Sequence, residues 1–186
     1  MKSSSVPFTS AAIAFAGCIA FAQAPASKPA ATGSALAAEA IIKGEGISGS
    51  VQLTERKEGV VEFTIQVKGL KPGRHGVHLH AIGKCEPDFA AAGGHFDPGP
   101  AGNTDPDANH PFHMGDIPNL TVSADGMGIA QGVTTRVTLS DGPLSLFDAD
   151  GSAIIVHANP DQGITGEPKS GVSGGPRVAC GVINKR

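Results

Sequence analysis

The sequence predicts an all-β domain, either an antiparallel sandwich or a barrel, on three observations. Short segments of alternating apolar and polar residues recur along the chain, and no segment has a convincing helical period. Glycine and proline are frequent, with 26 and 14 residues, and they separate these segments as turn residues do. A length of 186 residues suits one such domain with an N-terminal appendage.

The N-terminal 22 residues are typical of an export signal peptide. Lys2 precedes an apolar stretch, residues 11–22, that is too short to span a bilayer. The stretch ends in Ala20-Phe21-Ala22, which fits the small-x-small rule for cleavage. We therefore expect a periplasmic or secreted protein.

Cys18 offers an alternative to simple cleavage. The sequence around it loosely resembles a lipoprotein signal, in which this cysteine would carry the lipid anchor, although the apolar run continues beyond it. Residues 23–40 are rich in Ala and Pro and predict a flexible tether. The folded domain is then expected over residues 41–186, without a membrane span.

The strands are predicted in chain order from their alternation. Residues 46–56 and 59–70 flank a short turn that ends at Gly59, which predicts a hairpin. A second hairpin is predicted within residues 119–139, where Asp125-Gly126 separates two alternating runs. Further strands are expected at residues 75–83, 152–158 and 177–183. Two irregular stretches remain, and loops of their length are usually functional: residues 84–116 and 159–176.

The charge balance favours no nucleic-acid partner. The formal net charge is −3, or −4 without Lys2 of the signal peptide, and the sequence pI is about 6.1.

Two cysteines, Cys85 and Cys180, remain once Cys18 is assigned to the signal peptide, and in an exported domain a disulfide between them is the default expectation. It would close a loop of about 95 residues, worth roughly 4–5 kcal/mol in the chain-entropy account. Two buried free thiols are the alternative.

The histidines suggest a metal site. Three histidines and an aspartate lie in the irregular stretch 95–116, where they supply nitrogen and oxygen donors. His78 and His80 are two apart in a strand, so they share one face, either as exposed polar residues or as a pair of metal ligands. His157 ends an apolar strand and Arg177 opens the last one; taken singly, each is more often an ordinary surface residue.

Five motifs, in family order and with compatible spacing, resemble the copper–zinc superoxide dismutases: HGVHLHAIGKC, GGHFDP, HMGDIPNL, IIVHANPD and GPRVACGVI. The resemblance spans roughly residues 40–186. It implies an eight-stranded antiparallel Greek-key β-barrel or sandwich with two long functional loops. It also implies an enzyme that disproportionates superoxide to dioxygen and hydrogen peroxide through a Cu(II)/Cu(I) cycle, with copper and zinc as cofactors.

The resemblance assigns metal ligands by position. Four histidines match the copper ligands: His78, His80, His95 and His157. His95 matches the histidine that bridges copper to zinc and delivers a proton to the substrate. His113 and Asp116 match two further zinc ligands.

The resemblance also assigns roles around the metals. Arg177 matches the arginine that orients superoxide beside copper, and Asp161 matches the carboxylate that links a copper histidine to a zinc histidine. Cys85 and Cys180 match the family disulfide, and His75 matches a buried structural histidine.

The zinc half departs from the family pattern at one position. The family usually has another histidine midway between the residues matched by His95 and His113, but this chain has Asn103 or Thr104 there. One hypothesis is that His110 replaces it, giving the zinc set His95, His110, His113 and Asp116. The other is an incomplete zinc site in a copper-only enzyme, with His110 an ordinary loop residue. We take the first as the working hypothesis.

Two other functions are compatible with parts of the sequence. A non-catalytic copper-binding or copper-delivery domain would share the copper histidines, but it has less need of Arg177. A structural β-sandwich adhesin leaves the aligned histidines unexplained. The sequence is compatible with both a monomer and a homodimer.

Overall fold

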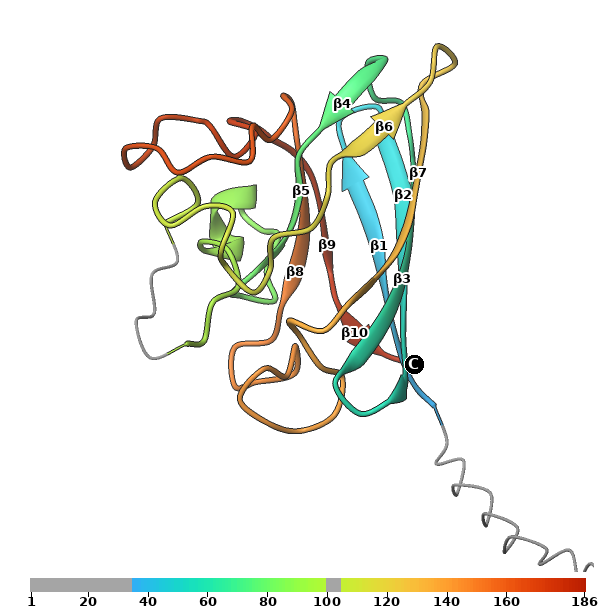
Figure 1. Cartoon of the computed structure of the whole chain (residues 1–186). Helices are drawn as coiled ribbons and strands as arrows, with labels where there is room; N and C mark the ends of the chain where they lie inside the picture. Colours follow the sequence, from blue (N-terminus) through green and yellow to red (C-terminus); the bar gives the residue numbers. More distant parts are fainter. Residues whose placement is uncertain (1–34, 100–104) are drawn as a thin grey trace, which may run out of the picture. The chain divides into compact units, whose positions relative to one another are not determined.

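The computed structural model describes residues 35–99 and 105–186, which form the strands and loops of Figure 1. The predicted signal peptide, Cys18 and most of the predicted tether lie outside the described residues, as do Asn103 and Thr104. Helix in the described ranges is limited to the 3-10 turn η1 (Phe89–Ala92). These ranges contain no helix long and apolar enough to cross a bilayer. The all-β prediction is confirmed.

The strands form one sheet in which every pairing is antiparallel. Its order is β4-β6-β7-β3-β2-β1-β9-β8-β5, and β10 pairs with β1 off this path. The bounds are β1 (Leu36–Gly44), β2 (Ile47–Lys57), β3 (Val60–Lys68), β4 (Gly73–His75), β5 (Val77–His80), β6 (Leu120–Val122), β7 (Met127–Thr134), β8 (Ala153–His157), β9 (Arg177–Val182) and β10 (Asn184–Lys185).

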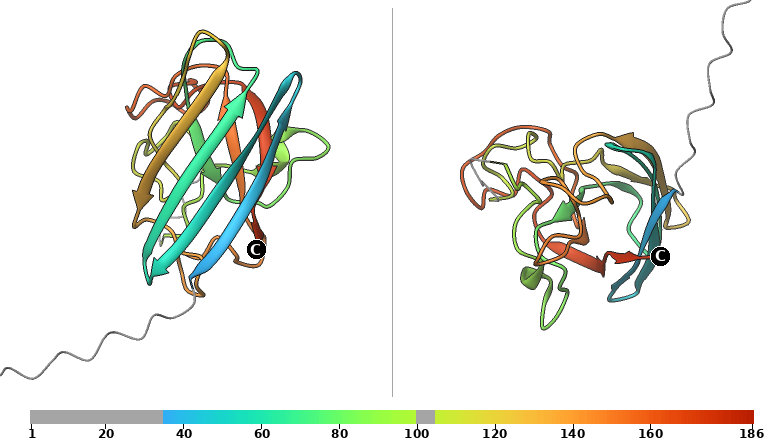
Figure 2. Two further views of the ribbon diagram at one scale, coloured as in Figure 1. Left: turned by 90° about the vertical axis from the view of Figure 1, so that its right-hand side faces the viewer. Right: turned by 90° about the horizontal axis from the view of Figure 1, so that it is seen from below.

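The sheet closes into a barrel through Gly76. β4 and β5 stand at opposite ends of the strand order, yet they flank this single residue in the chain. Counted as one strand, with the two-residue β10 set aside, they leave the eight strands that the resemblance implied. Figure 2 shows β1, β2, β3 and β7 side by side in the left view and the nearly closed ring of strands in the right view.

Both predicted hairpins are present. β2 and β3 pair from Ser48↔Lys68 to Lys57↔Val60, and β6 pairs with β7 at Val122↔Gly128. Gly126 has φ 78°, the left-handed conformation that glycine adopts without strain in such a turn.

β1 begins at Leu36, earlier than the boundary expected at residue 41. Ala38, Ala40 and Ile42 alternate into the core and are at most 1% exposed. The alanines at the start of this segment made it resemble the Ala/Pro-rich tether. Their small side chains instead line an inner strand face.

The segment after β7 also differs from the prediction. Alternation was expected to continue to residue 139, but β7 ends at Thr134 and residues 135–152 form a third long loop. The buried Glu55 on β2 accepts hydrogen bonds from the amides of Leu139 (2.6 Å) and Ser140 (2.7 Å). A side chain therefore satisfies backbone groups that a neighbouring strand would otherwise pair.

The two loops predicted to be functional lie together beside β5 and β8, at the left of Figure 1. The first, residues 81–119, is anchored in the barrel core by Phe96 (1% exposed) and Ile117 (7%). The second covers residues 158–176. The buried Asp107 joins them, because its carboxylate accepts hydrogen bonds from the amide of Gly171 and from the amide and hydroxyl of Ser173.

Candidate metal centre

The first loop lies along β5 and brings its own side chains beside the strand histidines. The amide of Leu79 donates to the carbonyl of Gly115 and the amide of Phe96 to that of Leu79, each at 2.9 Å. Bridges then pair His80 with His95 and His78 with Asp116. A Cβ at Gly115 would lie 2.3 Å from the carbonyl oxygen of Leu79, so this approach requires glycine.

Four histidines point ring nitrogens at a common centre. His78 and His80 come from β5, His157 from the end of β8 and His95 from the first loop, and each is at most 2% exposed. The loops thus cover the histidine face of β5, which excludes the exposed polar face considered from sequence. Each of these four rings has one buried nitrogen without a hydrogen-bond partner: His78 Nδ1, His80 Nε2, His95 Nε2 and His157 Nε2.

The unpartnered nitrogens of this four-histidine cluster fit a metal ion. One donor atom from each ring lies within 4.8 Å of the others. Leaving a buried polar atom unpaired costs about 1–3 kcal/mol, so four of them facing one point call for a ligand. An all-imidazole set in this arrangement suits copper.

The opposite nitrogen of each ring is held by a hydrogen bond, which fixes the direction of the free one. His80 Nδ1 donates to the carbonyl of Gly93 at 3.0 Å, and His157 Nδ1 donates to that of Gly175 at 2.9 Å. Carboxylates hold the other two: His78 Nε2 lies 3.1 Å from Asp161 Oδ2 and His95 Nδ1 lies 2.6 Å from Asp116 Oδ1.

Burial keeps the cluster neutral. It lowers the pKa of His95 and that of His157 to about 3 each, against an opposing hydrogen bond in both cases. Burial and the neighbouring imidazoles also lower the pKa of His80 well below its ordinary value, and burial lowers that of His78. Neutral imidazoles keep their lone pairs available, which is the state a metal ligand needs.

A second set of donors, here called the Asp116 cluster, consists of His95, His110, His113 and Asp116. Besides His95, the carboxylate has His113 Nδ1 at 3.1 Å and His110 Nδ1 at 3.2 Å, both from Oδ2. Burial would raise the pKa of the Asp116 carboxyl, but hydrogen bonds from the three histidines outweigh it and hold the pKa far below the ordinary value. The cluster therefore provides three imidazoles around a carboxylate, which is the chemistry of a zinc site.

His113 is less tightly grouped than the other members. Donor atoms of His78, His95, His110 and Asp116 lie within 4.8 Å of one another, whereas His113 is absent from that group. His78 has its Nε2 bound to Asp161 and its Nδ1 in the four-histidine cluster. We therefore place His78 in the four-histidine cluster and retain His113, through its contact with Asp116, in the second.

His110 is fully buried rather than an ordinary surface residue of the loop. Its Nε2 lies 2.7 Å from Asp161 Oδ1, and the other oxygen of Asp161 contacts His78. Burial lowers the pKa of His110, but Asp116 and Asp161 outweigh it and raise the pKa to about 9. Asp161 thus joins a histidine of each cluster, as the resemblance implied for this carboxylate.

Arg177 opens β9 beside the four-histidine cluster. Its Nη1 donates to the carbonyl of Phe89 and its Nη2 to that of Gly93, both at 2.6 Å. Because Gly93 also accepts from His80, one carbonyl fixes both the arginine and a histidine. A cavity of about 530 Å³ beside the cluster is lined by His157, by the cationic side chains of Arg177 and Lys169 and by the carboxylates of Asp105 and Asp107, among others.

The predicted disulfide is present between Cys85 and Cys180, with 5.8 Å between the Cα atoms. It joins the first loop to β9, the same two segments that Arg177 joins through Phe89 and Gly93. His75 is buried, and its ring nitrogens lie 2.8 Å from the carbonyl oxygens of His157 and Lys71.

Sequence reasoning missed the residues that act through backbone atoms. The carbonyls of Gly93 and Gly175 orient histidines, yet no side-chain pattern marks a carbonyl. It also missed Asp107, Thr165 and Arg136, which hold the loops. The only available signal was Asp107 within an Asp/Pro-rich run of a long loop.

Comparisons with known proteins agree with this geometry. Residues 47–183 match the family described as copper/zinc superoxide dismutase (SODC). A Cu-Zn superoxide dismutase of Caulobacter vibrioides is 44% identical over 154 residues, which cover 78% of this chain and 84% of the relative.

A solved structure is similar in fold. The crystal structure of the clock protein EA4 superposes with a TM-score of 0.67 at 27% identity, over 80% of this chain and 93% of the other. The family match, the Caulobacter relative and the histidine clusters identify the chain as an oxidoreductase that uses copper and zinc. The chain belongs to the copper/zinc superoxide dismutase family.

Proposed function

We propose that this chain disproportionates superoxide at a copper held by His78, His80, His95 and His157, beside a zinc held by His95, His110, His113 and Asp116. The observation that carries the proposal is the convergence of four buried, unpartnered imidazole nitrogens on one point. When bound, copper supplies a one-electron Cu(II)/Cu(I) couple and zinc supplies a fixed positive charge.

The choice of His110 as a zinc ligand is supported by its surroundings. It is buried between two carboxylates, with its Nδ1 3.2 Å from Asp116 Oδ2 and its Nε2 2.7 Å from Asp161 Oδ1. A buried nitrogen directed at Asp116 is what a replacement ligand requires. In a copper-only enzyme, His110 Nδ1 would be buried beside Asp116 without a metal to bind.

Arg177 and His95 act on the substrate in this proposal. The guanidinium of Arg177 attracts superoxide into the cavity and orients it beside His157. His95 Nε2, the nitrogen that would otherwise hold copper, would carry a proton to the reduced substrate when it is not bound to the metal, while Asp116 holds the Nδ1 side of the ring. Two superoxide anions and two protons give one dioxygen and one hydrogen peroxide.

The test combines metal content with turnover. Elemental analysis of protein matured with both metals should give one copper and one zinc per chain. Copper-loaded protein should consume superoxide faster than an equal concentration of free copper ion. Copper binding without such turnover would instead support the non-catalytic copper-binding or copper-delivery alternative.

We propose export to the periplasm or medium, which the disulfide favours because such bonds persist in oxidising compartments. Mass spectrometry of the mature protein should find an N-terminus at Gln23. An acylated Cys18 would contradict simple cleavage and support the lipid anchor.

Light scattering of the same preparation distinguishes the monomer from the homodimer.

A further inference from the structure

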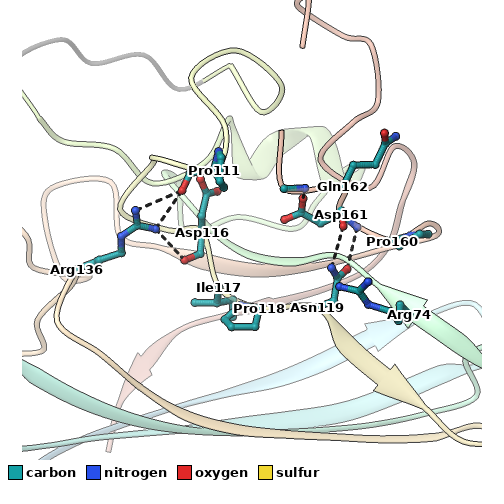
Figure 3. Close-up of a pocket in the computed structure, with 11 residues that line it drawn as sticks. Arg74, Pro111, Asp116, Ile117, Pro118, Asn119, Arg136, Pro160, Asp161 and Gln162 are labelled. Carbon is teal, nitrogen blue, oxygen red and sulfur yellow. Dashed lines mark hydrogen bonds between the residues drawn. The ribbon is translucent and has the colours of Figure 1, made fainter. Parts of the chain in front are cut away.

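A second cavity, of about 550 Å³, lies against the Asp116 cluster. It shares no lining residue with the cavity at Arg177. Asp116 and Asp161 contribute to its wall, and Figure 3 shows Arg136 and Arg74 on opposite sides of it. The mechanism proposed above uses neither arginine.

Arg136 connects the third loop to the zinc half of the first loop. Its Nη1 and Nη2 both donate to the carbonyl of Pro111 at 3.3 Å, and Nη1 also donates to the carbonyl of Asp116 at 3.4 Å (Figure 3). Pro111 directly follows His110, and Asp116 is itself a member of the cluster. One half-buried guanidinium therefore spans the segment that carries His110, His113 and Asp116.

The second loop also holds this segment. Thr165 Oγ1 donates to the carbonyl of His110 at 2.6 Å, and Asp161 Oδ1 holds the ring of the same residue. The backbone of Asp161 is in turn paired with the side chain of Asn119 at 2.8 and 2.9 Å. Contacts from the second loop thus hold His110, and Arg136 of the third loop holds the carbonyl of the next residue, Pro111.

We infer that Arg136 is a positioning residue for the zinc half, because it holds the carbonyls on either side of His113 so that His110 and Asp116 converge. The inference rests on the proposed zinc ligation by these residues. It explains how His110, three residues before His113, can serve as a zinc ligand, because contacts that do not depend on the metal hold the loop between them.

Charge and position predict opposite effects of removing Arg136, which makes the inference testable. A guanidinium near a zinc site repels a divalent cation, so loss of its charge alone would tighten zinc binding. Loss of its hydrogen bonds would loosen the ligand geometry and weaken zinc binding. Partners of metal ligands typically contribute about 10- to 100-fold in metal affinity.

The experiment compares wild type with Arg136→Met, Arg136→Lys and the matched control Arg74→Met. Arg74 lines the same cavity and carries the same charge, but it is exposed and makes no hydrogen bond to the first loop in the described structure. Zinc affinity is measured on copper-loaded protein by competition with a chromophoric chelator. The visible spectrum of the Co²⁺-substituted site reports its geometry, and bound copper reports the integrity of the barrel.

We expect Arg136→Met to bind zinc about 10- to 100-fold more weakly and to alter the Co²⁺ spectrum while copper stays bound. Arg136→Lys should fall between it and wild type, since a lysine keeps the charge but not the two-nitrogen fork. Arg74→Met should bind zinc at least as tightly as wild type. Unchanged or tighter zinc binding in Arg136→Met would overturn the inference alone, provided that His110→Ala still loses zinc. Wild type that binds no zinc would overturn the zinc half of the proposed function as well.

Discussion

The two halves of the metal centre are built in different ways. The four-histidine cluster takes three of its members from the strands β5 and β8, where the pleat and the register set the direction of each ring. The Asp116 cluster takes all of its members from the first loop, where side chains and carbonyls of other segments set the position. His95 belongs to both. Strands therefore fix the sequence positions of their ligands, whereas a loop can carry a ligand at a different position if its supporting contacts change with it.

The largest expected effect comes from breaking the strand-built half. His80→Ala removes one of four converging nitrogens and leaves the carbonyl of Gly93 without its histidine donor. We expect copper binding to be lost and superoxide consumption to fall to that of metal-free protein. Elemental analysis and a superoxide assay on the same sample check this. Retention of stoichiometric copper would exclude His80 from the ligand set.

The matched change in the loop-built half is His110→Ala. We expect zinc to be lost while copper remains, because His78, His80 and His157 lie on β5 and β8, and Asp161 Oδ2 can still hold His78 when His110 is removed. Phe112→Ala is the control, since Phe112 lies in the same segment but is 61% exposed. Metal content of both variants is the readout. Full zinc in His110→Ala would exclude His110 from the zinc ligands, and absence of zinc from both His110→Ala and wild type would support the copper-only hypothesis.

A smaller effect should follow from changing Arg177, because both metal-binding clusters are kept. Arg177→Ile should retain copper and lower turnover by about tenfold or more, since an attraction of about 1.4 kcal/mol already corresponds to a factor of ten. The dependence of the rate on ionic strength should also weaken. Rates at two salt concentrations, with bound copper quantified, check this. Unchanged turnover would remove Arg177 from the mechanism.

The smallest effect on the metals is expected at Glu55, which holds Leu139 and Ser140 of the third loop. Glu55 is buried and accepts hydrogen bonds from Gly59, Leu139 and Ser140. Burial opposes ionisation, but these hydrogen bonds outweigh it and lower the pKa. A lowered folded-state pKa stabilises the fold above the unfolded-state pKa, and that stability is lost as pH falls through the folded-state value.

Glu55→Gln should therefore lower the free energy of unfolding at pH 7 by about 1–3 kcal/mol, because a buried acceptor is lost. The difference from wild type should shrink below pH of about 4.3, the ordinary glutamate value. Urea unfolding of metal-free protein at several pH values measures both. Glu62→Gln, at an exposed position on β3, should change stability by no more than about 0.5 kcal/mol. A pH-independent difference between Glu55→Gln and wild type would contradict the assignment.

The same contrast explains how far the sequence could be interpreted. Alternation predicted most of the strands, and two-residue spacing put His78 and His80 on one face. It did not predict the start of β1, where alanines serve equally as linker and as inner face, or the loop after β7, where Glu55 replaces a partner strand. The contacts of Arg136 and Thr165 go to carbonyls, which carry no residue-type signal.

The most direct test of this account is anomalous X-ray diffraction from metal-loaded crystals at the copper and zinc edges. We expect a copper peak among His78, His80, His95 and His157 and a separate zinc peak among His95, His110, His113 and Asp116. A zinc peak without His110 in its coordination sphere, or no zinc peak beside a full copper peak, would contradict it.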